Sequence, residues 1–182
     1  MQNNIFLDRL ASEQVTRQNG NLSVDIDGDR IIEIPMPELM PGYDTNRDKE
    51  QLYFTRWVVY SGGEFVEKYF SYLNIGLSYS LTIPESMRES KITAKWERSE
   101  EKNNNEIVFY EYNGSLEEST EELFRICVIN QNDIDDSMAD YQRIATSGQL
   151  SYFVKTSELA SELYDLNNNT LKVNFTLISG DN

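Results

Sequence analysis

The pattern of apolar and polar positions along the chain predicts a framework of β-strands. Runs rich in Val, Ile, Thr, Tyr and Phe are bounded by Gly, Asn, Pro or Ser, which is typical of strands. Gly62-Gly63 and Asn103-Asn104-Asn105 are placed to close two hairpins. Neither alternate face of the segment 107–112 is purely polar, so a covering layer is expected on each side of the sheet. The strands are predicted near residues 21–26, 31–34, 51–60, 64–73, 76–83, 91–98, 105–112, 122–130, 141–146, 150–155 and 170–178.

Helices are predicted to be few and short. Asp133 can cap a helix of one or two turns that reaches Tyr141, and Ser157 can cap a second helix over 158–166. The Asn167-Asn168-Asn169 run is expected to end this second helix before the last strand. The fold class that follows is α+β, with a mostly antiparallel sheet flanked by short helices.

A change of composition near residue 74 predicts two parts. Residues 1–73 form a β-rich segment with an acidic loop, and residues 74–182 form an α+β module. The boundary is expected at 73–76. Because no flexible linker is present there, the two parts are expected to pack together.

Composition excludes several classes of enzyme. Of the 182 residues 39% are hydrophobic, and 21 are aromatic, which is enough to build a core. The chain has no His, so imidazole zinc sites and Ser-His-Asp or Cys-His catalysis are excluded. The single cysteine, Cys127, lies in an apolar run and is expected to be a small buried hydrophobe. We expect no enzymatic activity.

Charge and hydropathy limit the classes of partner. A net charge of −15 opposes binding to nucleic acid or to anionic lipid. No stretch approaches the roughly 20 apolar residues that span a bilayer. Met1-Gln2-Asn3-Asn4 lacks the basic and apolar regions of a signal peptide, which is only weak support for a cytoplasmic location.

Residues 97–122 carry nine of the glutamates and have a net charge of −7. They are interpreted either as solvated hairpin ends or as an acidic surface that occupies a basic groove in a partner. Glu106 and Glu111 have opposite parity within one strand, so they point to opposite faces. The charges are therefore predicted to scatter rather than to converge.

An acidic loop is the best candidate for an ion site. Asp25, Asp27, Asp29 and Glu33 can wrap a tight turn around a hard cation, and their oxygen ligands suit calcium. Arg30 stands where such loops favour Gly, which removes an easy left-handed turn and adds a positive charge. An Asx turn that closes a hairpin without metal remains the alternative.

Aromatic residues surround the Gly62-Gly63 turn. Trp57 precedes it, and Tyr69, Phe70 and Tyr72 follow it. They could stack on sugars or peptides, but large rings are also the normal filling of a sheet core, which is the preferred interpretation. The chain has no Gly-rich phosphate loop, nucleophile elbow or CxxC motif.

Several short motifs carry a resemblance to a family. The sequence resembles predicted secreted lipoproteins of Gram-positive, spore-forming anaerobes. The motifs of the first part are Asp25–Pro35, Leu39–Gly42, Tyr53–Trp57 and Tyr60–Gly63, which are similar to a blade of a calcium-loop, integrin-type propeller. Those of the second part are Gly76–Pro84, Lys91–Thr93, Ile107–Tyr112, Leu123–Ile126 and Tyr141–Ala145, which are similar to a PsbP-like α+β module.

The resemblance implies a role and a location. It implies a non-catalytic extracellular binding or structural module of a cell-envelope lipoprotein, held at the cell surface by a lipid anchor outside this chain, with an unknown protein or envelope ligand. One blade cannot close a propeller, so the chain is expected to be part of a longer protein or a reduced relative. The alternative is a cytoplasmic or phage-borne acidic inhibitor that mimics the charge of nucleic acid. The sequence leaves the ligand and the oligomeric state open.

Overall fold

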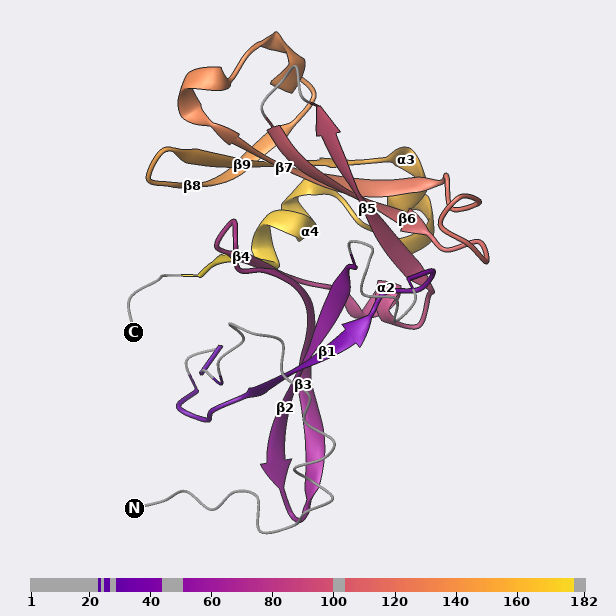
Figure 1. Ribbon diagram of the computed structural model, residues 1–182, viewed down its shortest axis with the longest axis vertical. Helices are drawn as coiled ribbons and strands as arrows, with labels where there is room; N and C mark the ends of the chain where they lie inside the picture. The colour runs from indigo at the N-terminus through magenta and orange to yellow at the C-terminus, as the bar shows by residue number, and fades with distance from the viewer. Residues whose placement is uncertain (1–22, 24, 27–28, 44–50, 100–103, 179–182) are drawn as a thin grey trace.

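The structure is a computed structural model, and it describes residues 23, 25–26, 29–43, 51–99 and 104–178. These residues form two antiparallel five-stranded sheets, three short helices and two 3₁₀ turns (Figure 1). The expectation of an α+β protein with a mostly antiparallel framework and few, short helices is confirmed.

The first sheet is a meander of four strands to which a strand from near the C-terminus is added. Its Gly62-Gly63 turn closes the β2–β3 hairpin as predicted, with φ angles of 64° and 95° that an L side chain rarely adopts. This hairpin extends away from the second sheet, towards the bottom of Figure 1. In spatial order the strands are β1 (Ile34–Leu39), β2 (Tyr53–Ser61), β3 (Glu64–Asn74), β4 (Tyr79–Thr82) and β10 (Phe175–Leu177).

The second sheet joins a three-stranded meander to a hairpin. The predicted pairing of the strands near 91–98 and 105–112 is confirmed, because Ile92 to Ser99 pair in unbroken register with Glu111 to Asn104. Asn104 and Asn105, which were expected in the turn, belong to the second of these strands. The strands in spatial order are β5 (Ile92–Ser99), β6 (Asn104–Glu111), β7 (Glu122–Asn130), β9 (Leu150–Thr156) and β8 (Gln142–Ser147).

The Pro-rich segment after the acidic loop is an edge strand. A strand was predicted at 31–34, whereas β1 runs over 34–39 and includes Pro35 and Pro37. Proline has no N–H to donate to a ladder, and a strand with a single neighbour tolerates it. Of the strand predicted at 21–26, Ser23, Asp25 and Ile26 are described and do not lie in a strand, and the other three residues lie outside the described part of the chain.

The asparagine run begins a helix rather than ending one. Ser157 caps α3 (Glu158–Tyr164) as predicted, and its Oγ accepts a hydrogen bond from the Ala160 N–H. Asn167 then caps α4 (Asn168–Val173). Its side-chain oxygen accepts hydrogen bonds from the N–H groups of Asn169 and Thr170. The strand predicted over 170–178 was therefore wrong in its first half, and β10 keeps only three residues.

The helix predicted from Asp133 is replaced by two 3₁₀ turns. These are η1 (Gln131–Asp133) and η2 (Asp136–Met138), and their caps are Asn130 and Asp135. Competing caps at short intervals divide the segment, because each Asn or Asp side chain binds a nearby N–H. Met138 is nevertheless buried.

One apolar core joins the two sheets. Tyr72 of β3 meets Phe109 of β6 edge to face at 5.4 Å between ring centroids, and Tyr79 of β4 meets Tyr152 of β9 at 5.9 Å. Helices α3 and α4 also contribute buried side chains to this core. The division expected at 73–76 falls in the turn between β3 and β4, which are neighbours in one sheet.

Cys127 and Trp57, for which the sequence allowed more than one role, lie inside the protein. Cys127 is fully buried on the far side of the second sheet, beside Phe153 and Met138, as expected. Trp57 is 3% exposed and its indole N–H donates to Ser71 Oγ at 2.8 Å. The preferred interpretation of Trp57 as a core residue is confirmed.

Candidate functional site

Two carboxylates of the acidic loop accept hydrogen bonds from the backbone of its described residues. Asp25 Oδ2 accepts from the Arg30 N–H at 2.8 Å, and Asp29 Oδ1 accepts from the Ile31 N–H at 2.7 Å. Arg30 has a φ of 71°, the left-handed conformation that glycine adopts without strain. Arg30 therefore adopts the left-handed conformation for which such loops favour glycine.

Glu33 is the residue of this loop with an unsatisfied atom. Its side chain is fully buried, and its Oε2 accepts from the Ile26 N–H at 3.0 Å. Its Oε1 is buried and has no hydrogen-bond partner. A buried carboxylate oxygen without a partner carries a large desolvation penalty, and a bound cation would remove it. This atom is the observation that fits a metal ion.

The remaining ligands of the predicted calcium site are not brought together in the described part of the chain. Asp29 Oδ2 forms an ion pair with Lys68 at 3.5 Å. Among the described residues no three acidic or cysteine side chains are grouped to hold a metal ion. Asp27, the fourth predicted ligand, lies outside the described residues.

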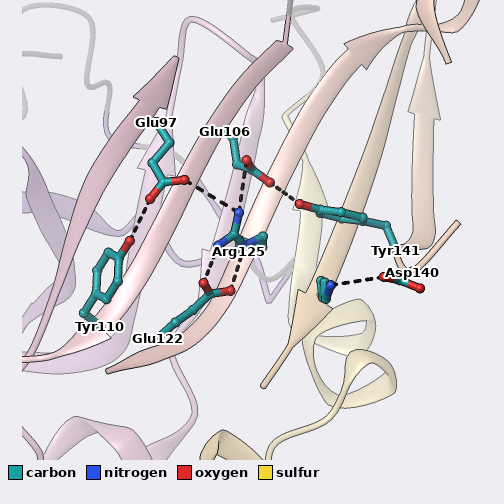
Figure 2. A network of polar contacts seen from close by, with 8 residues as sticks. Glu97, Glu106, Tyr110, Glu122, Arg125, Asp140 and Tyr141 are labelled. Atoms are coloured by element: carbon teal, nitrogen blue, oxygen red, sulfur yellow. Dashed lines mark hydrogen bonds and ion pairs between the residues drawn. The ribbon is translucent and has the colours of Figure 1, made fainter. Parts of the chain in front are cut away.

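A second cluster of carboxylates lies on the outer face of the second sheet, the face turned away from the shared core. Strand β7 places Arg125 there, and its guanidinium contacts three glutamates, one from each of β5, β6 and β7 (Figure 2). Glu122 accepts from two of its nitrogens, Glu106 lies at 3.2 Å and Glu97 at 3.6 Å. We call these four residues the Arg125 cluster.

Strand register brings the three carboxylates together. Glu97 and Glu106 stand directly opposite each other in the β5–β6 ladder. Like charges in such a pair are destabilising unless a counter-ion lies between them, and Arg125 supplies it. One guanidinium against three carboxylates leaves the cluster a formal charge of −2.

Two tyrosines donate hydrogen bonds to the Arg125 cluster. The Tyr110 hydroxyl donates to Glu97 at 2.8 Å, and the Tyr141 hydroxyl donates to Glu106 (Figure 2). Burial raises the pKa of both tyrosines, and the hydrogen bonds to the carboxylates raise it further. The hydrogen bonds that Arg125 donates to Glu122 raise the pKa of Arg125 and outweigh burial, which lowers it. The two tyrosines and Arg125 therefore keep their protons at neutral pH.

Two acidic loops flank this outer face. The loop 112–121 touches it where Ser119 O accepts from Lys95, and the loop 131–141 covers it through Met138 and Tyr141. Within the described residues, this face and its two loops carry ten acidic and four basic side chains. We call this surface the acidic face. The acidic residues are Glu97, Glu106, Glu117, Glu118, Glu121, Glu122, Asp133, Asp135, Asp136 and Asp140, and the basic ones are Lys95, Arg125, Arg143 and Lys155.

The Arg125 cluster was not predicted from the sequence. The acids of 97–122 were predicted to scatter, which is wrong for Glu97, Glu106 and Glu122. Opposite parity separates Glu106 from Glu111 within one strand, but it leaves out Glu97 on the neighbouring strand, 91–98. Pairing the predicted strands 91–98 and 105–112 from end to end would have put Glu97 opposite Glu106, and this was the available clue.

Comparisons with known proteins add no relative. No family model matches the sequence, and searches of curated proteins and of solved structures find no match. None of the helices in the described ranges is long and apolar enough to cross a membrane.

Proposed function

We propose that the protein is a non-catalytic binding module that holds a positively charged partner on its acidic face. The observation that carries the proposal is the Arg125 cluster, in which three glutamates share one guanidinium and keep a charge of −2. The two acidic loops add negative charge to the same surface. The resulting electrostatic field would attract a basic surface and speed its association.

The hydrogen bonding of the cluster supports binding rather than catalysis. Glu97 accepts from Tyr110 and Glu106 accepts from Tyr141. Both also form ion pairs with Arg125, and both oxygens of Glu122 accept from Arg125. Every carboxylate oxygen thus has a hydrogen-bond donor or an ion-pair partner, which suits a rigid charged surface better than a group that must exchange a proton. Each oxygen has a second lone pair with which to accept from a partner.

The resemblance described above supports a location for this module. We place it at the cell surface as part of an envelope lipoprotein, anchored by a lipid outside this chain. The blade-like first part and the PsbP-like second part belong to the same proposal. The partner is then a basic protein or envelope ligand.

The convergence of Glu97, Glu106 and Glu122 also favours a second candidate. A cytoplasmic or phage-borne inhibitor that mimics nucleic acid would need such a face to occupy a basic groove. Tight one-to-one binding to a nucleic-acid-processing enzyme, lost when Glu117, Glu118, Glu121 and Glu122 are changed to Gln, would favour this inhibitor over the envelope module.

A peptide of ten arginines with a fluorescent label tests the acidic face. We expect Glu97→Gln/Glu118→Gln to weaken its binding at least fivefold at 50 mM NaCl, as measured by fluorescence anisotropy. The matched control is Glu158→Gln/Glu162→Gln, which removes the same charge from exposed positions on α3. Equal losses in the two variants would show that only the net charge of the chain matters, and the proposal would be wrong.

We also propose that calcium binds the acidic loop through Asp25, Asp27, Asp29 and Glu33. The unsatisfied Oε1 of Glu33 supports this proposal. The ion would tie the loop to the start of β1. Calcium at a hundred times its Kd would stabilise the fold by about 2.7 kcal/mol. Equal thermal midpoints with millimolar calcium and with chelator would remove the site.

A further inference from the structure

An asparagine followed by glycine lies in the loop 112–121 of the acidic face. Asn113 and Gly114 are both exposed, and Gly114 has a φ of 96°. The turn is held by its backbone, because the Asn113 N–H donates to Ser119 Oγ at 3.1 Å and the Gly114 carbonyl accepts from the Tyr112 hydroxyl. These contacts fix the position of the pair and leave its side-chain amide at the surface.

The two groups of this pair that could react with each other are not engaged elsewhere. Neither the side-chain amide of Asn113 nor the N–H of Gly114 forms a hydrogen bond with any residue that the structure describes. Asparagine is one of the chemically labile residues of proteins. Glycine has no Cβ beside its nitrogen, so the carbonyl carbon of the preceding side chain can approach that nitrogen without hindrance.

We propose that Asn113-Gly114 is a site of spontaneous deamidation. The Gly114 nitrogen attacks Cγ of Asn113, loses its proton and expels ammonia, which closes a five-membered succinimide ring. Water then opens the ring at either carbonyl and leaves an aspartate or an isoaspartate at this position. The overall change is the hydrolysis of one amide to a carboxylate and ammonium, and water is the co-reactant.

The modification would add charge to the acidic face. Glu118 Oε2 lies 3.4 Å from the position that a Cβ on Gly114 would take, so the new carboxylate would join existing ones. With ten acidic and four basic side chains, the face would change from a charge of −6 to −7. A more negative surface attracts a cationic partner more strongly. The chemistry is independent of the proposed function, whereas this effect on binding rests on it.

Peptide mapping of the full chain tests the chemistry. After two weeks at 37 °C and pH 8.5, cleavage after glutamate releases the peptide 112–117, in which Asn113 is the single asparagine. We expect this peptide to gain the mass of an NH-to-O exchange at a rate within tenfold of that of the same peptide made synthetically. The internal control is Asn132, an exposed asparagine followed by Asp133, which should react at least fivefold more slowly.

Either of two results would overturn the proposed modification. A folded protein that reacts more than tenfold more slowly than the synthetic peptide would show that the loop protects Asn113. Less than a fivefold difference between Asn113 and Asn132 would show that the glycine does not select this site. The second pair of this kind in the sequence, Asn19-Gly20, lies outside the described residues, and the mapping separates it from Asn113.

The labelled peptide of ten arginines tests the effect on binding. We expect Asn113→Asp to tighten its binding about twofold at 50 mM NaCl. The matched control is Asn169→Asp, which adds the same charge at an exposed position on α4 and should change the Kd by less than 1.3-fold.

The binding results separate this effect from the proposed function. If Asn113→Asp and Asn169→Asp bind alike while Glu97→Gln/Glu118→Gln loses binding, the acidic face stands and the effect of deamidation on it is wrong. If Glu97→Gln/Glu118→Gln also matches its control, the proposed function is wrong and the effect on binding falls with it.

Discussion

Arginine and glutamate form a cluster on each of the two sheets, but in different proportions. On the first sheet Arg56 and Arg88 share Glu67, and Arg56 also lies 3.9 Å from Glu38, so two cations meet two anions. On the second sheet Arg125 alone meets three glutamates. The first cluster is neutral, whereas the second keeps a charge of −2.

The difference separates a structural role from a functional one. The neutral cluster holds α2 (Glu85–Arg88) against β3, because Arg88 also lies over the Phe70 ring at 5.8 Å. It leaves no net charge to act on another molecule. The Arg125 cluster holds its strands together by the same chemistry and still projects negative charge outward. We expect the two clusters to respond differently to the same substitution.

Removal of Arg125 should have the largest effect. Arg125→Met leaves Glu97, Glu106 and Glu122 without a counter-ion, and Glu106 is only 8% exposed. Breaking a largely buried ion pair on one side destabilises a protein by about 3–5 kcal/mol, and we expect the lower end. Urea unfolding at pH 7 measures the loss. The control Arg143→Met removes an exposed arginine of β8 and should stay within about 0.5 kcal/mol.

The same change in the neutral cluster should have a smaller effect. Arg88→Met leaves Glu67 paired with Arg56 at 2.8 Å, and the Arg88 side chain is 43% exposed. Exposed ion pairs contribute about 0.2–1 kcal/mol, so we expect a loss of at most about 1 kcal/mol by urea unfolding. A loss as large as that of Arg125→Met would contradict the distinction between the clusters.

The smallest expected effect is a change of stability at alkaline pH. It comes from the two tyrosines that donate hydrogen bonds to the Arg125 cluster. The pKa values of Tyr110 and Tyr141 are raised in the folded state, so their contribution is complete below the unfolded tyrosine pKa of about 10 and is lost as pH rises towards the folded values. Tyr110→Phe/Tyr141→Phe should therefore flatten the loss of stability above pH 10, by about 0.5 kcal/mol per tyrosine at pH 10.5.

Urea midpoints between pH 8 and pH 11 measure this slope. Tyr60→Phe, which changes an exposed tyrosine at the tip of the β2–β3 hairpin, is the control and should leave the slope unchanged. Parallel slopes for the double variant and the parent protein would show that the two hydroxyls do not titrate differently on folding.

The fold was predictable where local sequence decides it. Gly62-Gly63 closes its hairpin because only glycine adopts two successive positive φ angles without strain. Ser157 caps α3 because its hydroxyl reaches a free N–H. The asparagine run was ambiguous, since Asn167 ends one element and begins another with equal ease. Its role depends on α4 packing beside β9, which is a tertiary contact.

The candidate sites, like the fold, were predictable only where a local sequence pattern decides them. The acidic loop was proposed from alternating carboxylates within nine residues, whereas the ion pair of Asp29 with Lys68 joins it to a bulge in β3, which is distant in sequence. The Arg125 cluster joins three strands through their register. A single residue of register shift would move Glu106 to the core face, so no local pattern contains the cluster.

The order in which the strands are synthesised differs from their order in the first sheet. Strand β4 is synthesised well before its neighbour β10, whose Phe175 and Leu177 lie opposite Leu81 and Tyr79. On a ribosome the interval between them is on the order of ten seconds. For that time β4 has an open edge on which a neighbouring nascent chain could pair. Dense polysomes are thus the setting in which this fold is most exposed to misassembly.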